Sequence, residues 1–142
     1  MKPTVLIARA IFPEVLEHLQ GHFDVTSNQE DVMRTPEQLR QLALGKQGLL
    51  TTGSERIDAA FLLACPCLKI CANMAVGFNN FDLGAMTGAG VLATNTPDVL
   101  TETTADFGFA LMMAAARRMA ESEHYLRAGL WKRWRYDMFA GA

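Results

Sequence analysis

Five short, largely apolar runs that alternate with helical segments are the feature that most constrains the fold of this chain. They have the length of strands and lack the strict alternation of a half-exposed strand. The runs are Thr4–Ala8, Phe23–Ser27, Gly48–Thr52, Leu68–Ala72 and Val91–Thr94. Strands that are apolar on both faces belong to sheets that helices cover on both sides, and right-handed crossovers place the helices there. The sequence therefore predicts an α/β fold with a doubly wound, flavodoxin-like parallel five-stranded sheet.

The helices between these runs carry start and stop signals. Pro13 is a favourable first residue for the first helix. In the second helix, Thr35 is the expected N-cap, Pro36 the first helical residue, and Gln38 the partner that completes a capping box. This helix is expected to end at Gly45, because glycine readily adopts the left-handed conformation that ends helices. Two further helices are expected over residues 58–65 and 81–86.

The segment Cys71–Asp82 leads from the fourth strand into the following helix through a turn of small residues. Gly77 is expected to adopt backbone angles that a side chain would forbid. Such a turn leaves the N–H groups of Ala75, Val76 and Gly77 unpaired, which suits a carboxylate or a phosphate. Ligands of open parallel sheets bind beyond the carboxyl ends of the strands, where this turn lies. The alternative is an ordinary strand-to-helix turn without a ligand.

Composition excludes several classes of function. The chain has 142 residues, the length of one domain, and a net charge of -2, so nothing favours binding to nucleic acid or to an anionic membrane. No apolar run approaches the roughly 18 residues of a membrane span, and no signal peptide precedes the first strand. Cys65, Cys67 and Cys71 lack the spacing of a zinc site, so we expect no metal and interpret them as buried free thiols. The cytoplasm is the expected compartment.

The character of the chain changes after Pro97. One long helix is expected from Thr101 to about Leu126, because no proline interrupts it and most of its faces are apolar. Such a helix must be buried on more than one side. The tail that follows mixes tryptophan with arginine, which is typical of nucleic-acid binding by stacking or of a protein interface; the acidic chain favours the interface. We therefore divide the chain into residues 1–97, a linking and dimer-interface helix at 98–128, and an aromatic, basic dimerisation arm at 129–142.

Two stretches resemble the D-isomer-specific 2-hydroxyacid dehydrogenases: Ala75–Asp82 (AVGFNNFD) and Val91–Asp106 (VLATNTPDVLTETTAD). The chain looks most like the glyoxylate/hydroxypyruvate reductase branch, to which the 2-ketogluconate reductases are close. The resemblance covers essentially the whole chain and is most specific over Thr96–Ala105. It implies a two-domain enzyme that reduces small 2-keto acids with NADPH or NADH. This chain resembles the amino-terminal, substrate-binding part of such an enzyme.

The resemblance also implies roles for individual residues. The amides of Val76 and Gly77 would hold the substrate carboxylate, which agrees with the anion-binding interpretation of the turn. Leu100 would line the substrate pocket, and Thr104 would contact the cofactor beneath the nicotinamide. Helix capping is the alternative for both of these residues. Trp134 would reach from one subunit into the active site of its partner in a homodimer.

No catalytic residue is expected within this chain. The cofactor-binding fingerprint of the family and its catalytic arginine, glutamate and histidine would lie beyond Ala142. His18, His22 and His124 lie on expected helices and not at the carboxyl end of a strand, so none is interpreted as the catalytic acid. The chain is therefore expected to be a truncated form that lacks the Rossmann cofactor domain and is inactive alone.

Two other classes of protein remain as alternatives. A non-catalytic oligomerisation protein would use only the apolar helix and the aromatic tail. A flavodoxin-like or receiver-like binding module would have a similar number of strands. A receiver needs acidic residues after its first and third strands, and Arg9–Phe12 and Thr52–Ser54 contain none.

Overall fold

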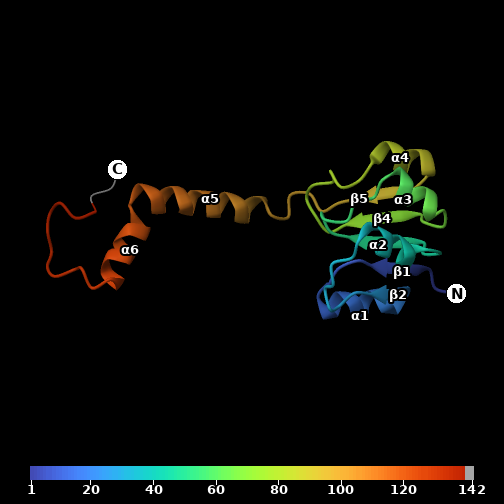
Figure 1. Ribbon diagram of the computed structural model, residues 1–142, viewed down its shortest axis with the longest axis horizontal. Helices are drawn as coiled ribbons and strands as arrows, with labels where there is room; N and C mark the ends of the chain where they lie inside the picture. Colours follow the sequence, from blue (N-terminus) through green and yellow to red (C-terminus); the bar gives the residue numbers. More distant parts are fainter. Residues whose placement is uncertain (140–142) are drawn as a thin grey trace. The chain divides into compact units, whose positions relative to one another are not determined.

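The computed structural model describes residues 1–139 and divides the chain into two compact units, Met1–Asp98 and a second that begins at Val99. In the described part of the first unit, five parallel strands form one sheet in the order β2-β1-β3-β4-β5 (Figure 1). The strands are β1 (Thr4–Ile7), β2 (Asp24–Ser27), β3 (Gly48–Thr51), β4 (Ile70–Asn73) and β5 (Leu92–Thr94). This is the strand order of flavodoxin-like sheets, so the expected α/β fold is confirmed.

Three of the four helices of the first unit begin after a residue whose side chain caps a free N–H group, and α1 begins at Pro13 without such a cap. They are α1 (Pro13–His22), α2 (Pro36–Ala43), α3 (Ala59–Ala64) and α4 (Leu83–Ala89). The Thr35 hydroxyl accepts a hydrogen bond from the Gln38 amide at 3.2 Å, and the Gln38 side chain accepts one from the Thr35 amide at 2.9 Å. The Asp58 and Asp82 carboxylates cap α3 and α4 by accepting from the Phe61 and Ala85 amides, without a reciprocal bond. The expected capping box is therefore present.

The core of the first unit forms where these helices pack against the sheet. Its completely or almost completely buried members include Leu6, Leu49 and Cys71 from the strands and Ile57 and Met86 from the segments between them. Burial of such side chains stabilises the fold by about 1.5–3 kcal/mol each. The full cluster is Leu6, Ala8, Leu39, Ala43, Leu49, Ile57, Phe61, Leu62, Cys65, Leu68, Cys71, Phe81, Met86 and Val91.

Two details of the first unit differ from expectation. Cys67 is exposed, although Cys65 and Cys71 are buried as expected, because it follows Pro66 in the loop before β4. All three residues of β5 are exposed, since this strand is an edge strand that pairs only with β4. The rule that apolar strands are covered on both faces therefore holds for the central strands and not for this edge.

The second unit contains two helices where the sequence predicted one. They are α5 (Thr101–Ala116) and α6 (Met119–Arg127), so the expected single helix over residues 98–128 is wrong. Arg118 separates them in the left-handed conformation, with φ of 51° and its amide bonded to the Ala115 carbonyl. Its guanidinium pairs with Glu121 at 2.6 Å and lies 5.3 Å from the centre of the Phe139 ring. The left-handed conformation is unfavourable for a residue with a side chain, and these contacts accompany it at Arg118.

No helix within residues 1–139 is both long enough and apolar enough to cross a membrane.

The capping box of α2 provides a test of the local structure. Replacement Thr35→Ala removes the acceptor for the Gln38 amide and is expected to lower the free energy of unfolding by about 1 kcal/mol. The matched control is Thr87→Ala in α4, where the hydroxyl donates only to the Leu83 carbonyl of the preceding turn. Urea denaturation should show a change within about 0.5 kcal/mol for the control. Equal losses for both variants would contradict the assignment of a stabilising cap.

Candidate functional site

The turn that follows β4 lies beside the loop that follows β3. The Met74 amide donates to the Thr51 carbonyl at 2.8 Å, which extends the pairing of these strands to the first residue of the turn. A methyl group on Gly53 would lie 3.8 Å from the side chain of Ala75, so the loop and the turn are in van der Waals proximity. The carboxyl ends of two central strands thus meet here, which is where ligands of open parallel sheets bind.

At residues 75–77 of this turn the carbonyl groups are hydrogen-bonded, and the N–H groups are not bonded within residues 1–139. The carbonyls of Ala75, Val76 and Gly77 each accept a hydrogen bond from within the first unit. The donors are, in that order, the Thr96 amide at 2.9 Å, Asn95 Nδ2 at 2.8 Å and Asn73 Nδ2 at 2.8 Å. The N–H groups of the same three residues donate to no atom of residues 1–139. The turn therefore presents free donors with all of its acceptors occupied, an arrangement that suits an anion.

Gly77 serves the turn differently from what the sequence predicted. Its φ is not in the left-handed region, where among the described glycines only Gly45, Gly90 and Gly129 lie. A side chain at Gly77 would meet no atom within 4 Å, so neither strain nor crowding requires glycine here. The expectation of forbidden backbone angles is wrong. What glycine provides is an uncovered amide that a ligand can approach closely.

A cluster of charged side chains lies at the same edge of the sheet, after β1 and β3. Arg9 forms a bidentate pair with Asp31, with Nε at 2.7 Å from one carboxylate oxygen and a terminal nitrogen at 2.8 Å from the other. Another terminal nitrogen lies 3.2 Å from the Ser54 hydroxyl and 3.8 Å from Glu55. The hydrogen bond from Arg9, followed by that from the Ala10 amide, lowers the pKa of Asp31 to about 2. Arg9 is therefore paired and is not a free cation for a substrate.

Leu100 and Thr104 lie at the start of α5 in the second unit. Leu100 is the N-cap residue and makes no side-chain capping bond. The Thr104 amide donates to the Leu100 carbonyl at 2.9 Å as part of the helix, and its exposed hydroxyl bonds to no atom of the described chain. Leu100 thus occupies the N-cap position through its backbone, and neither residue caps the helix through its side chain.

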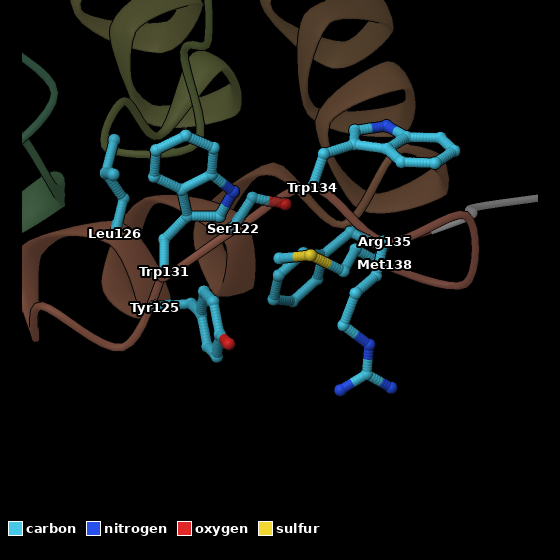
Figure 2. Close-up of a pocket in the computed structure, with 8 residues that line it drawn as sticks. Ser122, Tyr125, Leu126, Trp131, Trp134, Arg135 and Met138 are labelled. Atoms are coloured by element: carbon cyan, nitrogen blue, oxygen red, sulfur yellow. The ribbon is translucent and has the colours of Figure 1, made fainter.

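Trp134 lies in the second unit, beside a pocket of about 450 Å³ that Figure 2 shows. Aromatic rings form much of its wall, and the Tyr125 and Phe139 rings meet edge to face at 5.3 Å. Trp134 is 77% exposed. The residues that line the pocket are Ser122, Tyr125, Leu126, Trp131, Trp134, Arg135, Met138 and Phe139.

The structure thus places Val76 and Gly77 together in the first unit, and Leu100, Thr104 and Trp134 within the second. His18 and His22 lie together on α1, and His124 lies on α6. Within residues 1–139, no three His, Cys, Asp or Glu side chains are grouped as metal ligands. The sequence analysis missed Asn73 and Asn95, which hold two carbonyls of the turn. Asn73 had a detectable signal, because it is a polar residue at the end of an otherwise apolar strand.

A family model and a relative of known name each match most of this chain. The family model described as the catalytic domain of D-isomer specific 2-hydroxyacid dehydrogenases matches residues 5–128. A glyoxylate reductase from Thermococcus kodakarensis is 44% identical over 133 residues, which are 94% of this chain and 40% of that protein.

Two solved structures share the fold. A protein from Thermus thermophilus has a TM-score of 0.85 and 35% identity, and the match covers 97% of this chain and 44% of that one. An NADPH-dependent glyoxylate/hydroxypyruvate reductase from Sinorhizobium meliloti, in complex with NADP and malonate, has a TM-score of 0.72 and 29% identity. That match covers 92% of this chain and 40% of the other. The chain spans less than half the length of each of these relatives.

The charged cluster predicts a specific pH dependence. Because the pKa of Asp31 is about 2 in the folded protein and ordinarily 3.8, its pairing stabilises the fold above that range and is lost as the pH falls through about 2. In Arg9→Ala, the carboxyl should titrate closer to 3.8, while the Ala10 amide keeps it below that value. The difference in free energy of unfolding between the wild type and Arg9→Ala should therefore become smaller at acidic pH.

Carbon NMR titration of the Asp31 carboxyl and urea denaturation at neutral and acidic pH measure both effects. Arg40→Ala is the control, because Arg40 pairs with Glu37 on α2 and should leave the Asp31 titration unchanged. An Asp31 carboxyl that still titrates near 2 in Arg9→Ala would show that the ion pair is not the cause.

Proposed function

The chain belongs to the D-isomer specific 2-hydroxyacid dehydrogenase family, and we propose that it forms the substrate-binding part of an NAD(P)H-dependent 2-keto acid reductase. The proposed substrates are small 2-keto acids such as glyoxylate and hydroxypyruvate, in line with the names of its relatives. The observation that carries the proposal is the turn at residues 75–77, with three free N–H groups and three occupied carbonyls.

The proposed reaction is the reduction of the keto carbon to an alcohol. The nicotinamide supplies the hydride, and a proton added to the keto oxygen completes the 2-hydroxy acid. The contribution of this chain is to bind and orient the substrate carboxylate through the amides of Ala75, Val76 and Gly77. Hydrogen bonds from N–H groups to a charged acceptor contribute roughly 1.5–3 kcal/mol each. Because the turn carbonyls are already bonded, the amides need little rearrangement to receive the anion.

Three residues of the second unit have proposed roles. In this proposal the exposed Thr104 hydroxyl contacts the nicotinamide cofactor, NADP or NAD, and Leu100 lines the substrate pocket. Trp134 would enter the active site of a partner subunit. The free thiols of Cys65, Cys67 and Cys71 are consistent with a reducing compartment, and we place the protein in the cytoplasm.

The surface of α5 supports assembly into a homodimer. No residue of this helix is buried, although its apolar side chains are large. Contiguous apolar surface of this kind marks an interaction site on a folded protein. The exposed members are Phe107, Phe109, Leu111, Met112 and Met113. The same surface would serve a non-catalytic oligomerisation protein, but that alternative does not explain the free N–H groups of the turn at residues 75–77.

Titration of the chain with glyoxylate tests the carboxylate site directly. In ¹⁵N-edited NMR spectra, the amide signals of Ala75, Val76 and Gly77 should shift together and saturate with a Kd in the millimolar range, equivalent to roughly 4 kcal/mol or less. Sodium chloride at the same ionic strength should not reproduce the shifts.

The variant Gly77→Ala should weaken glyoxylate binding without lowering the stability of the fold. The added methyl meets no atom within 4 Å, so stability should not fall, but it narrows the approach to the amide and should weaken binding several-fold. Gly21→Ala, which also meets no atom within 4 Å, is the control and should bind as the wild type does. The proposal fails if the wild-type turn amides do not respond to glyoxylate.

Sedimentation equilibrium tests the homodimer. Phe109→Asp places a charge on the apolar surface of α5 and is expected to weaken association by more than about tenfold, and Trp134→Ala by less. Thr103→Asp adds the same charge to the first turn of the helix, where a negative charge is favourable, and serves as the control. A folded wild-type chain that remains monomeric at micromolar concentration would contradict the homodimer.

A further inference from the structure

The side chain of Asn73 is almost completely buried, with 2% of its surface exposed, and every hydrogen-bonding group that it has is in use. Its Nδ2 donates to the Gly77 carbonyl at 2.8 Å and to Asn80 Oδ1 at 3.0 Å. Its Oδ1 accepts from the Thr51 hydroxyl at 2.9 Å. Asn73 therefore ties the end of β4 to the end of β3 and to the turn.

Asn80 contacts Asn73 and also binds the neighbouring loop at residues 52–55. Its Oδ1 accepts from Asn73 Nδ2, and its own Nδ2 lies 3.3 Å from Asn73 Oδ1. The same nitrogen donates to the Thr52 carbonyl at 3.1 Å and the Glu55 carbonyl at 2.9 Å. Glu55 in turn accepts from the Thr52 amide at 2.6 Å. The loop at residues 52–55 and the turn at residues 74–79 are thus held by one pair of amides.

We infer that Asn73 and Asn80 are positioning residues, which hold the turn peptides so that their N–H groups meet the substrate carboxylate. This inference rests on the proposed function and adds to it the residues that preorganise the site. The Asn73 bond fixes the Gly77 carbonyl, and the planar peptide group fixes the Phe78 N–H with it, so the backbone of Gly77, whose own N–H is a proposed donor, is held at its carbonyl end. The Asn80 bonds keep the loop at residues 52–55 against the turn as the second wall of the site.

The energetics favour this role over simple core packing. A buried amide contributes little net stability, because its hydrogen bonds replace those with water. An apolar residue at the end of β4 would avoid this desolvation. The Nδ2 of Asn73 instead donates to Gly77 and Asn80 in the irregular segment around the turn, where no sheet ladder orders the backbone.

The test compares three variants of the full chain by the same glyoxylate titration. Asn73→Ala should raise the Kd about tenfold, because the amides are no longer held in the binding orientation. Asn80→Ala affects a half-buried residue and should have a smaller effect in the same direction. Asn28→Ala is the matched control. Asn28 is also buried and donates two side-chain hydrogen bonds, to Ala8 and Val32, so its loss should lower stability without changing the Kd.

A second readout needs no ligand. In Asn73→Ala, the ¹⁵N relaxation of Gly77 and Phe78 should show increased mobility, and in Asn28→Ala it should not. If the wild type does not bind glyoxylate, the proposed function and this inference both fail. If the wild type binds and Asn73→Ala and Asn80→Ala bind equally well, only this inference fails. If Asn73→Ala does not fold, Asn80→Ala decides the question by the same criterion.

Discussion

The register of β3 against β4 is the constraint on which the candidate site depends. It places Thr51 opposite Asn73 at the last paired position of both strands. The Thr51 hydroxyl can then donate to Asn73 Oδ1, and both Asn73 hydrogens remain for the turn and for Asn80. A slip of one residue would direct Asn73 to the other face of the sheet and remove the support of the turn. The apolar core that sets the register thus also sets the site.

The two units differ in how far their apolar side chains are buried. The first has a buried core, and within the described residues it leaves no buried side-chain polar atom without a partner. The second has helices without a single buried residue, although α5 is rich in phenylalanine, leucine and methionine. A helix of this composition is stabilised by what packs against it and not by its own sequence. The first unit therefore has a core of its own, whereas the second leaves the apolar side chains of α5 exposed.

Local sequence signals were reliable wherever the structure is decided locally. Thr35, Pro36 and Gln38 lie next to one another in the helix start that they stabilise, so their pattern predicted the capping box. The break at Arg118 has no comparable signal, because neither glycine nor proline is present and the stabilising contact comes from Phe139, distant in sequence. Gly77 was interpreted through backbone strain, whereas the structure shows an unstrained backbone and no atom within 4 Å of an added side chain.

The sequence by itself determined the α/β class with five strands in a parallel sheet, and the location of the turn at Val76 and Gly77. These follow from short-range patterns of polarity and from glycine and proline, which act within a few residues. Only the tertiary structure decided which turn carbonyls are occupied and that Asn73 and Asn80 pair. Those contacts join segments 4 to 28 residues apart, and their geometry exists only after the sheet has brought the strand ends together.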